Sequence, residues 1–384
     1  MNSDNSTSEK KKKISNEKIW VFAPYTQTTD ANLDYYCDYT QSIAEYERVF
    51  ASRAIPWEWV PVRLHNIDKV IASVLSESEL TGLQPVVLNL CDGDEINGSP
   101  GVTVIKKLQN AGMVFTGADE KFFALTTSKI PMKHAFDVAG VPTPLWEIVN
   151  EKDDQIFDRL GAPLIIKPAV SGGSLGVGIK NVVYNFSELR QVVKSIKRGY
   201  RGWNLASDGV IAEQFIQGRE FTVFISGSAN NPENAHIYSP VERVFHPSLP
   251  PDQRFLSFDR LWEIYEAETA MPDEGNFYEY QLAPPELHDE LKGISWAAYC
   301  ATNGKGYTRV DIRLDEHSRK FYILEVNAQC GISEDENYTS IGAILKYSEK
   351  DFSGLVFEII ADGKRRKKKA PAVIKVRRNR KERA

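Results

Sequence analysis

The chain has 384 residues, of which 42% are hydrophobic, 26% charged and 11% aromatic, and this composition excludes a disordered or fibrous protein. No apolar run approaches the roughly 20 residues of a membrane-spanning helix, and residues 1–18 lack the apolar core of a secretion signal, so we expect a cytoplasmic protein without a membrane partner. The net charge of −5 is unevenly spread, because residues 362–384 hold twelve Lys or Arg against two acidic residues, which leaves residues 1–361 at −15.

The N-terminal third of the chain alternates predicted strands with predicted helices. Residues 1–18 are polar and basic and are predicted to form a disordered arm. Short runs rich in β-branched and aromatic residues predict strands at 19–22, 57–62 and 85–90, and apolar residues three and four apart predict helices at 36–50 and 67–75. This alternation predicts an α/β domain, residues 19–128, with an open and mostly parallel sheet.

A second unit is predicted to begin at Lys129, where an amphipathic helix is stopped by a glycine and two prolines. Residues 246–285 are rich in proline and aromatic residues and have no clear period, which is typical of a lid or binding element. We therefore expect a central subdomain at 129–212, a C-terminal subdomain at 213–361 that includes this lid, and a disordered basic tail at 362–384. The strands predicted there lie at 163–168, 210–216, 220–225, 307–313 and 320–327, and a last helix lies at 355–360.

A glycine-rich stretch, 171–178, directly follows one of these strands. Glycines let backbone N–H groups approach a polyphosphate, and Ser171 and Ser174 add hydroxyl donors. The stretch matches neither the dinucleotide-binding fingerprint nor a Walker A loop, because no Gly-Lys-Ser/Thr follows it. On this feature alone, a phosphate loop and a plain glycine-rich hairpin both stay open.

Polar residues interrupt the last two predicted strands. Glu325 and Asn327 are two residues apart, so both point to one face of their strand. Together with Asp311 on the preceding strand they offer the oxygen ligands that magnesium prefers. Arg309 shares the face of Asp311 and is placed to meet charge on a transferred phosphoryl or acyl group. The alternative is a solvated face with a salt bridge.

Two lysines stand out by their positions. Lys167 ends an apolar strand just before the glycine-rich stretch, and Lys129 opens a helix. A lysine in an apolar strand costs desolvation free energy unless an anion meets it, and a phosphate would serve. Taken by itself, Lys129 is equally read as a surface lysine.

These motifs, in this order, resemble the ATP-grasp superfamily and, within it, the D-alanine–D-alanine ligases. The resemblance runs from Asn89 to the last helix and is carried by Lys129, Lys167 and the segments 116–119, 140–144, 172–177, 213–223, 309–311 and 324–327. It implies an α/β (α+β) chain with the three-domain ATP-grasp fold, and a homodimer.

The resemblance implies a binding site for ATP. The residues that would bind it are Lys129 and Lys167 at the phosphates, Gly172, Gly173 and Ser174 in a loop that closes over them, Glu213, Phe215 and Ile216 at the adenine, and Glu220 at the ribose.

The resemblance also implies the chemistry. Asp311, Glu325 and Asn327 would bind two Mg²⁺ ions, which Mn²⁺ can replace, while Arg309 and Ser174 would be the catalytic residues. A small-molecule carboxylate would be activated as an acyl phosphate and attacked by an amine, with release of ADP and phosphate. No side-chain nucleophile is needed, because alignment and electrostatics suffice.

The sequence departs from the ligases at the expected substrate positions. The family's N-terminal glycine-rich turn has no counterpart, Asp92 stands where the family has a histidine, and Leu261-Trp262 replaces a Lys-Tyr of the lid. Glu336 falls where a serine would receive the carboxylate of the second D-alanine. A carboxylate repels a carboxylate, so we expect an acceptor amine that lacks this carboxylate or carries a second positive charge.

Three alternatives remain beside this ligase, and the third is a binding protein whose function the basic tail carries. A D-alanine–D-alanine ligase proper and a carboxylate kinase or phosphotransferase would use the same ATP site, and product formation without an amine would distinguish the kinase. The acidic body is expected not to bind nucleic acid. The basic tail is read as a solvated extension, with a nuclear signal or a contact to a polyanion or an acidic membrane as the alternative.

Overall fold

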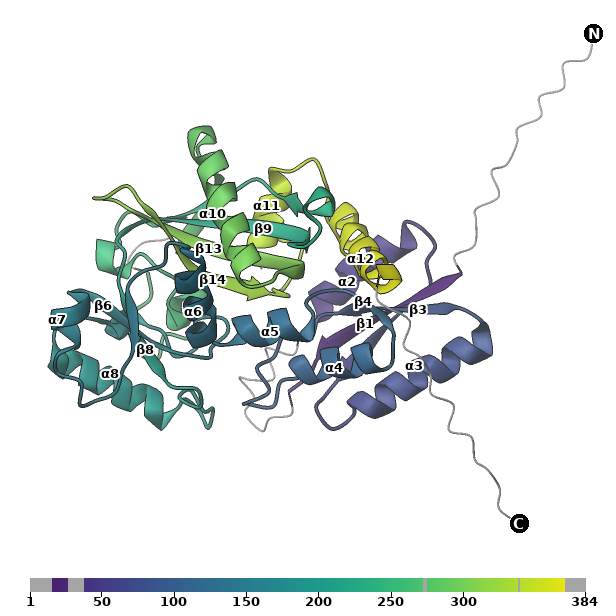
Figure 1. Ribbon diagram of the computed structural model, residues 1–384, viewed down its shortest axis with the longest axis horizontal. Coiled ribbons are helices and arrows are strands. Elements are labelled where there is room, and N and C mark those ends of the chain that lie inside the picture. Colours follow the sequence, from purple (N-terminus) through teal and green to yellow (C-terminus); the bar gives the residue numbers. More distant parts are fainter. Residues whose placement is uncertain (1–15, 27–37, 272–274, 338, 370–384) are drawn as a thin grey trace, which may run out of the picture.

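The computed structural model describes residues 16–26, 38–271, 275–337 and 339–369. Residues 1–15 of the predicted arm, the start of the first predicted helix and the tail from residue 370 lie outside these residues. The arm was predicted to extend to residue 18, which was wrong at its end, because Glu17 and Lys18 already belong to the first strand. Figure 1 shows three parts: the N-terminal sheet with α3 and α4, the central part with β6, β8, α7 and α8, and a sheet containing β9, β13 and β14. Among the described residues, no helix is long and apolar enough to cross a membrane.

The N-terminal sheet is parallel, in the order β2-β1-β3-β4, which confirms the predicted sheet. Side chains of β1 alternate between its faces, so Ile19 and Val21 pack with α2 and α12, and Trp20 and Phe22 pack with α3 and α4. Its elements are β1 (Glu17–Pro24), α2 (Thr40–Ala51), β2 (Trp57–Val62), α3 (Ile67–Thr81), β3 (Gln84–Asn89), α4 (Val102–Asn110) and β4 (Val114–Phe115).

The central sheet is antiparallel, in the order β5-β8-β6-β7. Buried residues of β6 and β8 form a core with α7 and α8, and the cavity described below lies at the edge of this unit. Its elements are β5 (Trp146–Ile148), α7 (Ile156–Leu160), β6 (Leu164–Pro168), β7 (Val182–Val183), α8 (Phe186–Arg198) and β8 (Val210–Gln214), with a 3-10 turn, η2 (Ile179–Asn181).

The C-terminal sheet is antiparallel, in the order β12-β11-β9-β13-β14, with β10 beside β9. One face, with Phe221, Val223 and Val310, packs against α5, α6 and α10, and part of the other face packs against α11 and α12. Its elements are α5 (Glu120–Thr127), α6 (Lys129–Ala139), β9 (Gly218–Ser228), β10 (His236–Ile237), β11 (Val241–Phe245), β12 (Tyr278–Leu282), α10 (His288–Ala301), β13 (Lys305–Asp315), β14 (Phe321–Ala328), α11 (Ser340–Lys346) and α12 (Phe352–Lys369), with 3-10 turns η3 (Pro232–Asn234) and η5 (Pro285–Leu287).

The predicted lid at 246–285 is partly regular structure. It contains η4 (Pro251–Gln253) and a short helix, α9 (Phe258–Leu261), and its last part is the edge strand β12. Because β12 pairs with β11 from Val241 to Phe245, residues 278–282 belong to the sheet and the prediction of one continuous loop was wrong there.

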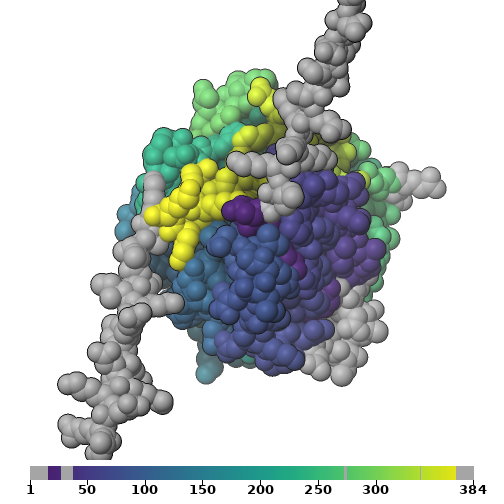
Figure 2. Space-filling model, turned by 90° about the vertical axis from the view of Figure 1, so that its right-hand side faces the viewer, coloured from purple at the N-terminus to yellow at the C-terminus, as the bar shows by residue number. Residues whose placement is uncertain are grey.

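The predicted tail also begins too early. Helix α12 continues to Lys369, and Arg366 donates hydrogen bonds from Nη2 to the carbonyl of Gly117 at 2.8 Å and from Nε to Asp362 Oδ2 at 2.8 Å. Lys364 forms an ion pair with Glu17 on β1. Figure 2 shows this yellow helix lying against the purple and blue N-terminal domain. Residues 362–369 are therefore part of the fold.

Truncation should separate these two parts of the basic segment. Removing residues 370–384 keeps every contact named above, whereas removing residues 364–384 also removes Arg366 and Lys364. Hydrogen bonds to a charged group contribute about 1.5 to 3 kcal/mol each, so we expect the melting temperature to fall by several degrees only for the longer truncation. Thermal unfolding of both truncated proteins measures this, and equal melting temperatures would contradict it.

Candidate active site

A cavity of about 1420 Å³ lies where the three parts meet. Its lining includes every site residue that the sequence analysis singled out: Asp92, Lys129, Lys167, Gly172, Gly173, Ser174, Glu213, Phe215, Ile216, Glu220, Trp262, Arg309, Asp311, Glu325, Asn327 and Glu336. These residues come from segments that are more than two hundred positions apart, so the fold brings together what the motifs suggested one by one. The role of each residue stays a prediction.

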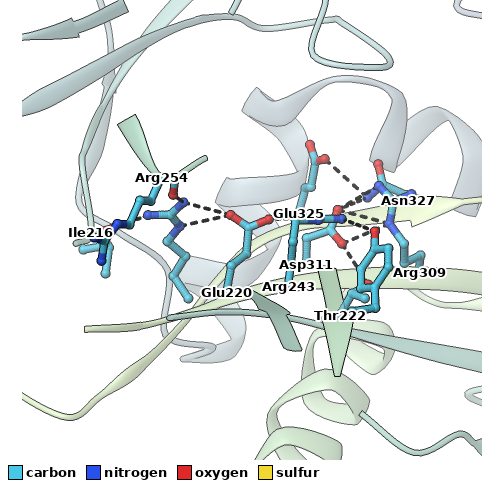
Figure 3. A network of polar contacts seen from close by, with 11 residues as sticks. Ile216, Glu220, Thr222, Arg243, Arg254, Arg309, Asp311, Glu325 and Asn327 are labelled. Carbon is cyan, nitrogen blue, oxygen red and sulfur yellow. Dashed lines mark hydrogen bonds and ion pairs between the residues drawn. The ribbon is translucent and has the colours of Figure 1, made fainter. Parts of the chain in front are cut away.

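Strand register creates the acidic part of the cavity (Figure 3). Arg309 on β13 lies opposite Asn327 on β14, and Asp311 lies opposite Glu325. Asn327 Nδ2 donates to Asp311 Oδ2 at 2.9 Å and to Glu325 Oε1 at 3.3 Å, and Thr222 Oγ1 donates to Asp311 Oδ1 at 3.0 Å. The predicted face of alternate residues is therefore present.

Arg309 and Asp311 form a two-point ion pair. Arg309 Nε lies 2.9 Å from Asp311 Oδ1, and its Nη2 lies 2.8 Å from Oδ2. Burial opposes ionisation of Asp311, but Arg309 and the hydrogen bonds hold the pKa of this carboxyl below its ordinary value. Asp311 is therefore ionised at neutral pH and able to bind a cation.

The residues present fit a magnesium ion. Within the described residues, no cluster of three or more His, Cys, Asp and Glu side chains suits a metal, so a site of protein ligands alone is not indicated. Two carboxylates and the amide of Asn327 are the partial set that Mg²⁺ uses when phosphate and water complete its coordination. Asn327 would then turn its amide oxygen toward the ion.

Lysines form a second charged cluster. Lys167 Nζ lies 2.8 Å from Glu213 Oε1, Lys133 Nζ lies 2.5 Å from Glu213 Oε2, and both Lys133 and Glu213 are fully buried. Burial alone would raise the pKa of Glu213, but the two lysines hold it at about 2. Because two lysines share one carboxylate, burial lowers the pKa of Lys133 despite this partner. The cluster carries a surplus positive charge.

Lys129 contacts both the acidic residues of β14 and the glycine-rich stretch. Its Nζ lies 3.6 Å from Glu325 Oε2 and 3.3 Å from Ser171 Oγ, at the start of the glycine-rich stretch. The residue is only 8% exposed and sits at the N-terminus of α6, where Ser128 caps the helix. Its contacts to both the acidic row and the loop exclude the reading of Lys129 as a free surface lysine.

The glycine-rich loop is held by Trp262 of the lid. Trp262 Nε1 donates to the carbonyl of Gly173 at 2.9 Å, and a Cβ atom at Gly173 would lie 3.0 Å from the indole ring. Gly173 also has a φ of +55°, so glycine is favoured there on two grounds. Ser174, with φ of +61°, shares this left-handed turn, and its carbonyl accepts from Val177 N at 2.9 Å.

Asp92 and Glu336, the residues expected near the substrates, both line the cavity. Asp92 is open to the cavity, and burial by the surrounding protein, with Asp94 nearby, raises its pKa to about 6. With a pKa of about 6, this carboxylate is mostly ionised at pH 7. Both carboxylate oxygens of Glu336 lie 3.0 Å from Lys346 Nζ, so Glu336 already has a cation beside it.

The sequence analysis missed the charged residues around Glu220. Arg243 on β11 and Arg313 on β13 are its direct neighbours across the sheet, and each is under 5% exposed. Lys133 was missed as well. A signal for Arg313 was present, because it follows Arg309 and Asp311 at the strand period of two in an otherwise apolar strand, as Lys167 does in its own strand.

Comparison with known proteins shows which sequences this chain is similar to. The family model described as "D-ala D-ala ligase C-terminus" matches residues 137–361. The D-alanine–D-alanine ligase of Pseudoalteromonas atlantica is 30% identical over 238 residues, 59% of this chain and 63% of that protein. That of Bordetella petrii is 28% identical over 228 residues, 59% of this chain and 61% of that protein. The chain thus matches about three fifths of the length of these relatives.

Solved structures show the same fold. The D-alanine–D-alanine ligase of Bacillus anthracis complexed with ATP superimposes with a TM-score of 0.62 at 19% identity, covering 92% of this chain and 99% of that one. The VanG D-Ala:D-Ser ligase of Enterococcus faecalis gives a TM-score of 0.62 at 16% identity, covering 91% and 100%. The predicted α/β fold and its resemblance to ATP-grasp ligases are confirmed.

The pKa of Glu213 predicts how stability depends on pH. Its folded value of about 2 lies below the ordinary 4.5, so its contribution is complete above pH 4.5 and is lost as the pH falls toward 2. This contribution is about 3 kcal/mol at pH 7.

Glu213→Gln should therefore lower the free energy of unfolding strongly at pH 7 and less at pH 3.5, measured by urea titration. Glu147→Gln, at an exposed ion pair with Arg159, is the control and should cost under about 1 kcal/mol. A pH-independent effect of Glu213→Gln would contradict the assignment.

Proposed function

The chain belongs to the family of the D-alanine–D-alanine ligase C-terminal region, and from that premise we propose that it is an ATP-dependent carboxylate–amine ligase. It would form an amide or peptide bond through an acyl phosphate, release ADP and phosphate, and act on substrates other than two D-alanines.

One observation carries this proposal: the position of Lys129. Its ammonium group lies within 3.6 Å of both Glu325, in the acidic row, and Ser171, in the glycine-rich loop. Lysines, loop N–H groups and two carboxylates thus converge in one cavity, which is the combination that a triphosphate and its divalent cation require. A structural salt-bridge network would have no reason to place a glycine-rich loop beside its charges.

The proposed reaction has two steps. A carboxylate oxygen of the donor attacks the γ-phosphorus of ATP, the bond to the bridging oxygen breaks, and ADP leaves. The amine nitrogen then attacks the acyl carbon, phosphate leaves, and the nitrogen loses its proton to solvent. Lys129 and Lys167 would hold the phosphates, and Arg309 would stabilise the charge on the acyl phosphate and the tetrahedral intermediate.

Asp311, Glu325 and Asn327 would hold the magnesium. When bound, this ion neutralises phosphate charge and orients the transferred group. The chain's own contribution is to keep these three side chains in register through β13 and β14, and to keep Asp311 ionised through Arg309.

Glu336 argues against D-alanine as acceptor. Its ion pair with Lys346 uses the cation that an acceptor carboxylate would need at this place, so such a carboxylate would meet Glu336 directly. Both partners are about half exposed, so this repulsion is worth no more than about 1 kcal/mol. We propose that the acceptor lacks a carboxylate here or carries a second positive charge.

Removing the predicted metal ligand should abolish turnover. For Asp311→Asn we expect a loss of at least about 100-fold in magnesium-dependent ADP release, because an amide replaces an anionic ligand and leaves Arg309 without its partner. Asp68→Asn, at an exposed pair with Lys107, is the matched control and should be unaffected. Full turnover by Asp311→Asn, or a wild-type protein without magnesium-dependent nucleotide affinity, would refute the proposed function.

An amine screen tests the acceptor. Mass spectrometry of products formed with ATP, magnesium and a mixed pool of amino acids and amines should show more product from diamines than from D-alanine. Glu336→Ser should raise the use of D-alanine about fivefold, because it removes the facing carboxylate. Efficient D-alanyl-D-alanine formation by the wild-type protein would contradict this acceptor, and phosphorylated product without any amine would identify a kinase instead.

A further inference from the structure

A row of three buried charges crosses the C-terminal sheet next to the acidic row. Arg243, Glu220 and Arg313 are direct neighbours on β11, β9 and β13, and each is 5% exposed or less. Arg243 Nη1 donates a hydrogen bond to Glu220 Oε1. Arg313 Nη2 and Nε lie 2.8 and 3.2 Å from Glu220 Oε2. Burying a guanidinium costs free energy unless its N–H groups have hydrogen-bond partners. The groups that accept hydrogen bonds from Arg313 are therefore held in place beside it.

Arg313 also holds two backbone segments. Its Nη1 donates to the carbonyl of Ile216 at 2.9 Å, its Nη2 donates to the carbonyl of Arg254, and its guanidinium lies 5.4 Å from the centre of the Phe215 ring. Figure 3 shows Ile216, Arg254 and Glu220 gathered at one end of the network. One side chain thus joins the linker between β8 and β9, strand β9 and Arg254 of the lid.

The lid is fixed at further points beyond Arg254. The ring of Phe255 meets the edge of Phe215 at 5.7 Å between centres, and Phe258 N donates to the carbonyl of Val177 at 2.8 Å. With the bond of Trp262 to Gly173, the lid spans from the linker to the glycine-rich loop. A shift of the lid therefore disturbs both walls of the nucleotide site proposed above.

We propose that Arg313 is a positioning residue that couples residues 254–268 of the lid to the linker at 215–216. The inference rests on the proposed function, because these segments line the expected nucleotide site. A guanidinium serves this role because its planar fork donates in several fixed directions, whereas a lysine ammonium is a single point charge. Nucleotide binding and the conformation of the lid are then coupled equilibria. Nucleotide binding favours one lid position, and that lid position raises the affinity for nucleotide.

Arg313→Lys tests the coupling while keeping the charge beside Glu220. We expect the KM for ATP to rise about tenfold with kcat changed less than about threefold, since hydrogen bonds to the linker are lost. A magnesium complex of a non-hydrolysable ATP analogue should protect the lid from trypsin at Arg254 and Arg260 in the wild-type protein. In Arg313→Lys, saturating analogue should no longer protect these sites.

Arg219→Lys is the matched control. Arg219 makes a two-point ion pair with Glu242 on the neighbouring strand and is 36% exposed, so this variant should keep the wild-type KM and lid protection. Loss of stability alone would raise cleavage everywhere and would not remove the effect of the analogue. Equal KM and equal protection in Arg313→Lys and Arg219→Lys would overturn the coupling.

Hydrogen exchange of the wild-type protein decides the matter if Arg313→Lys does not fold. The analogue should slow exchange in the linker at 215–217 and in the lid at 254–268 over the same concentration range. Slowed exchange in the linker without any change in the lid would overturn the coupling while leaving the proposed ligase intact. Absence of analogue binding would instead overturn the proposed function, and the coupling with it.

Discussion

Ion pairs between charged side chains on one face of the C-terminal sheet fix the positions of the residues that line the cavity. Strand geometry places Arg309, Asp311 and Arg313 on one face of β13. Arg309 and Asp311 pair with each other, and the neighbouring strands supply Thr222 and Asn327 to Asp311 and Glu220 to Arg313. A charge removed from bulk water is tolerated only when it is paired, so these side chains have little freedom. The cavity wall is therefore ordered before any ligand enters, and this order is what electrostatic stabilisation of a reacting group needs.

The lysines on the other side of the cavity carry a surplus of positive charge. Lys133 and Lys167 share Glu213, and Lys129 has only a long contact of 3.6 Å with Glu325, so the lysine wall favours an anion with several charges. The acidic row beside it favours a cation. The two walls together favour a ligand that carries both negative and positive charge, as a metal–polyphosphate complex does. A simple anion would be attracted only to the lysines.

Much of this site was predictable because its signals are local. The period of two put Glu325 and Asn327 on one face, the lysine at the end of an apolar strand marked Lys167, and glycines marked the loop. The ion pairs of Glu213 and Glu220 were not predictable, since they depend on which strands become neighbours across the sheet. Glu213 and Glu220 were expected at the nucleotide, and the structure shows each also holding two cationic side chains. Strand β12 was missed although Tyr278, Tyr280 and Leu282 alternate with two polar residues, because it lies inside a longer segment, 246–285, that has no clear period as a whole.

The position of helix α12 has a consequence for how the molecule is made. Its Leu355, Val356 and Ile359 complete the core beneath Ile19 and Val21, which belong to the first strand of the chain. During synthesis the N-terminal sheet and α2 emerge early, but the part of this apolar face that α12 covers stays exposed until almost the whole polypeptide has left the ribosome. The first domain to appear is thus among the last to be finished, and a chaperone has that interval in which to shield it.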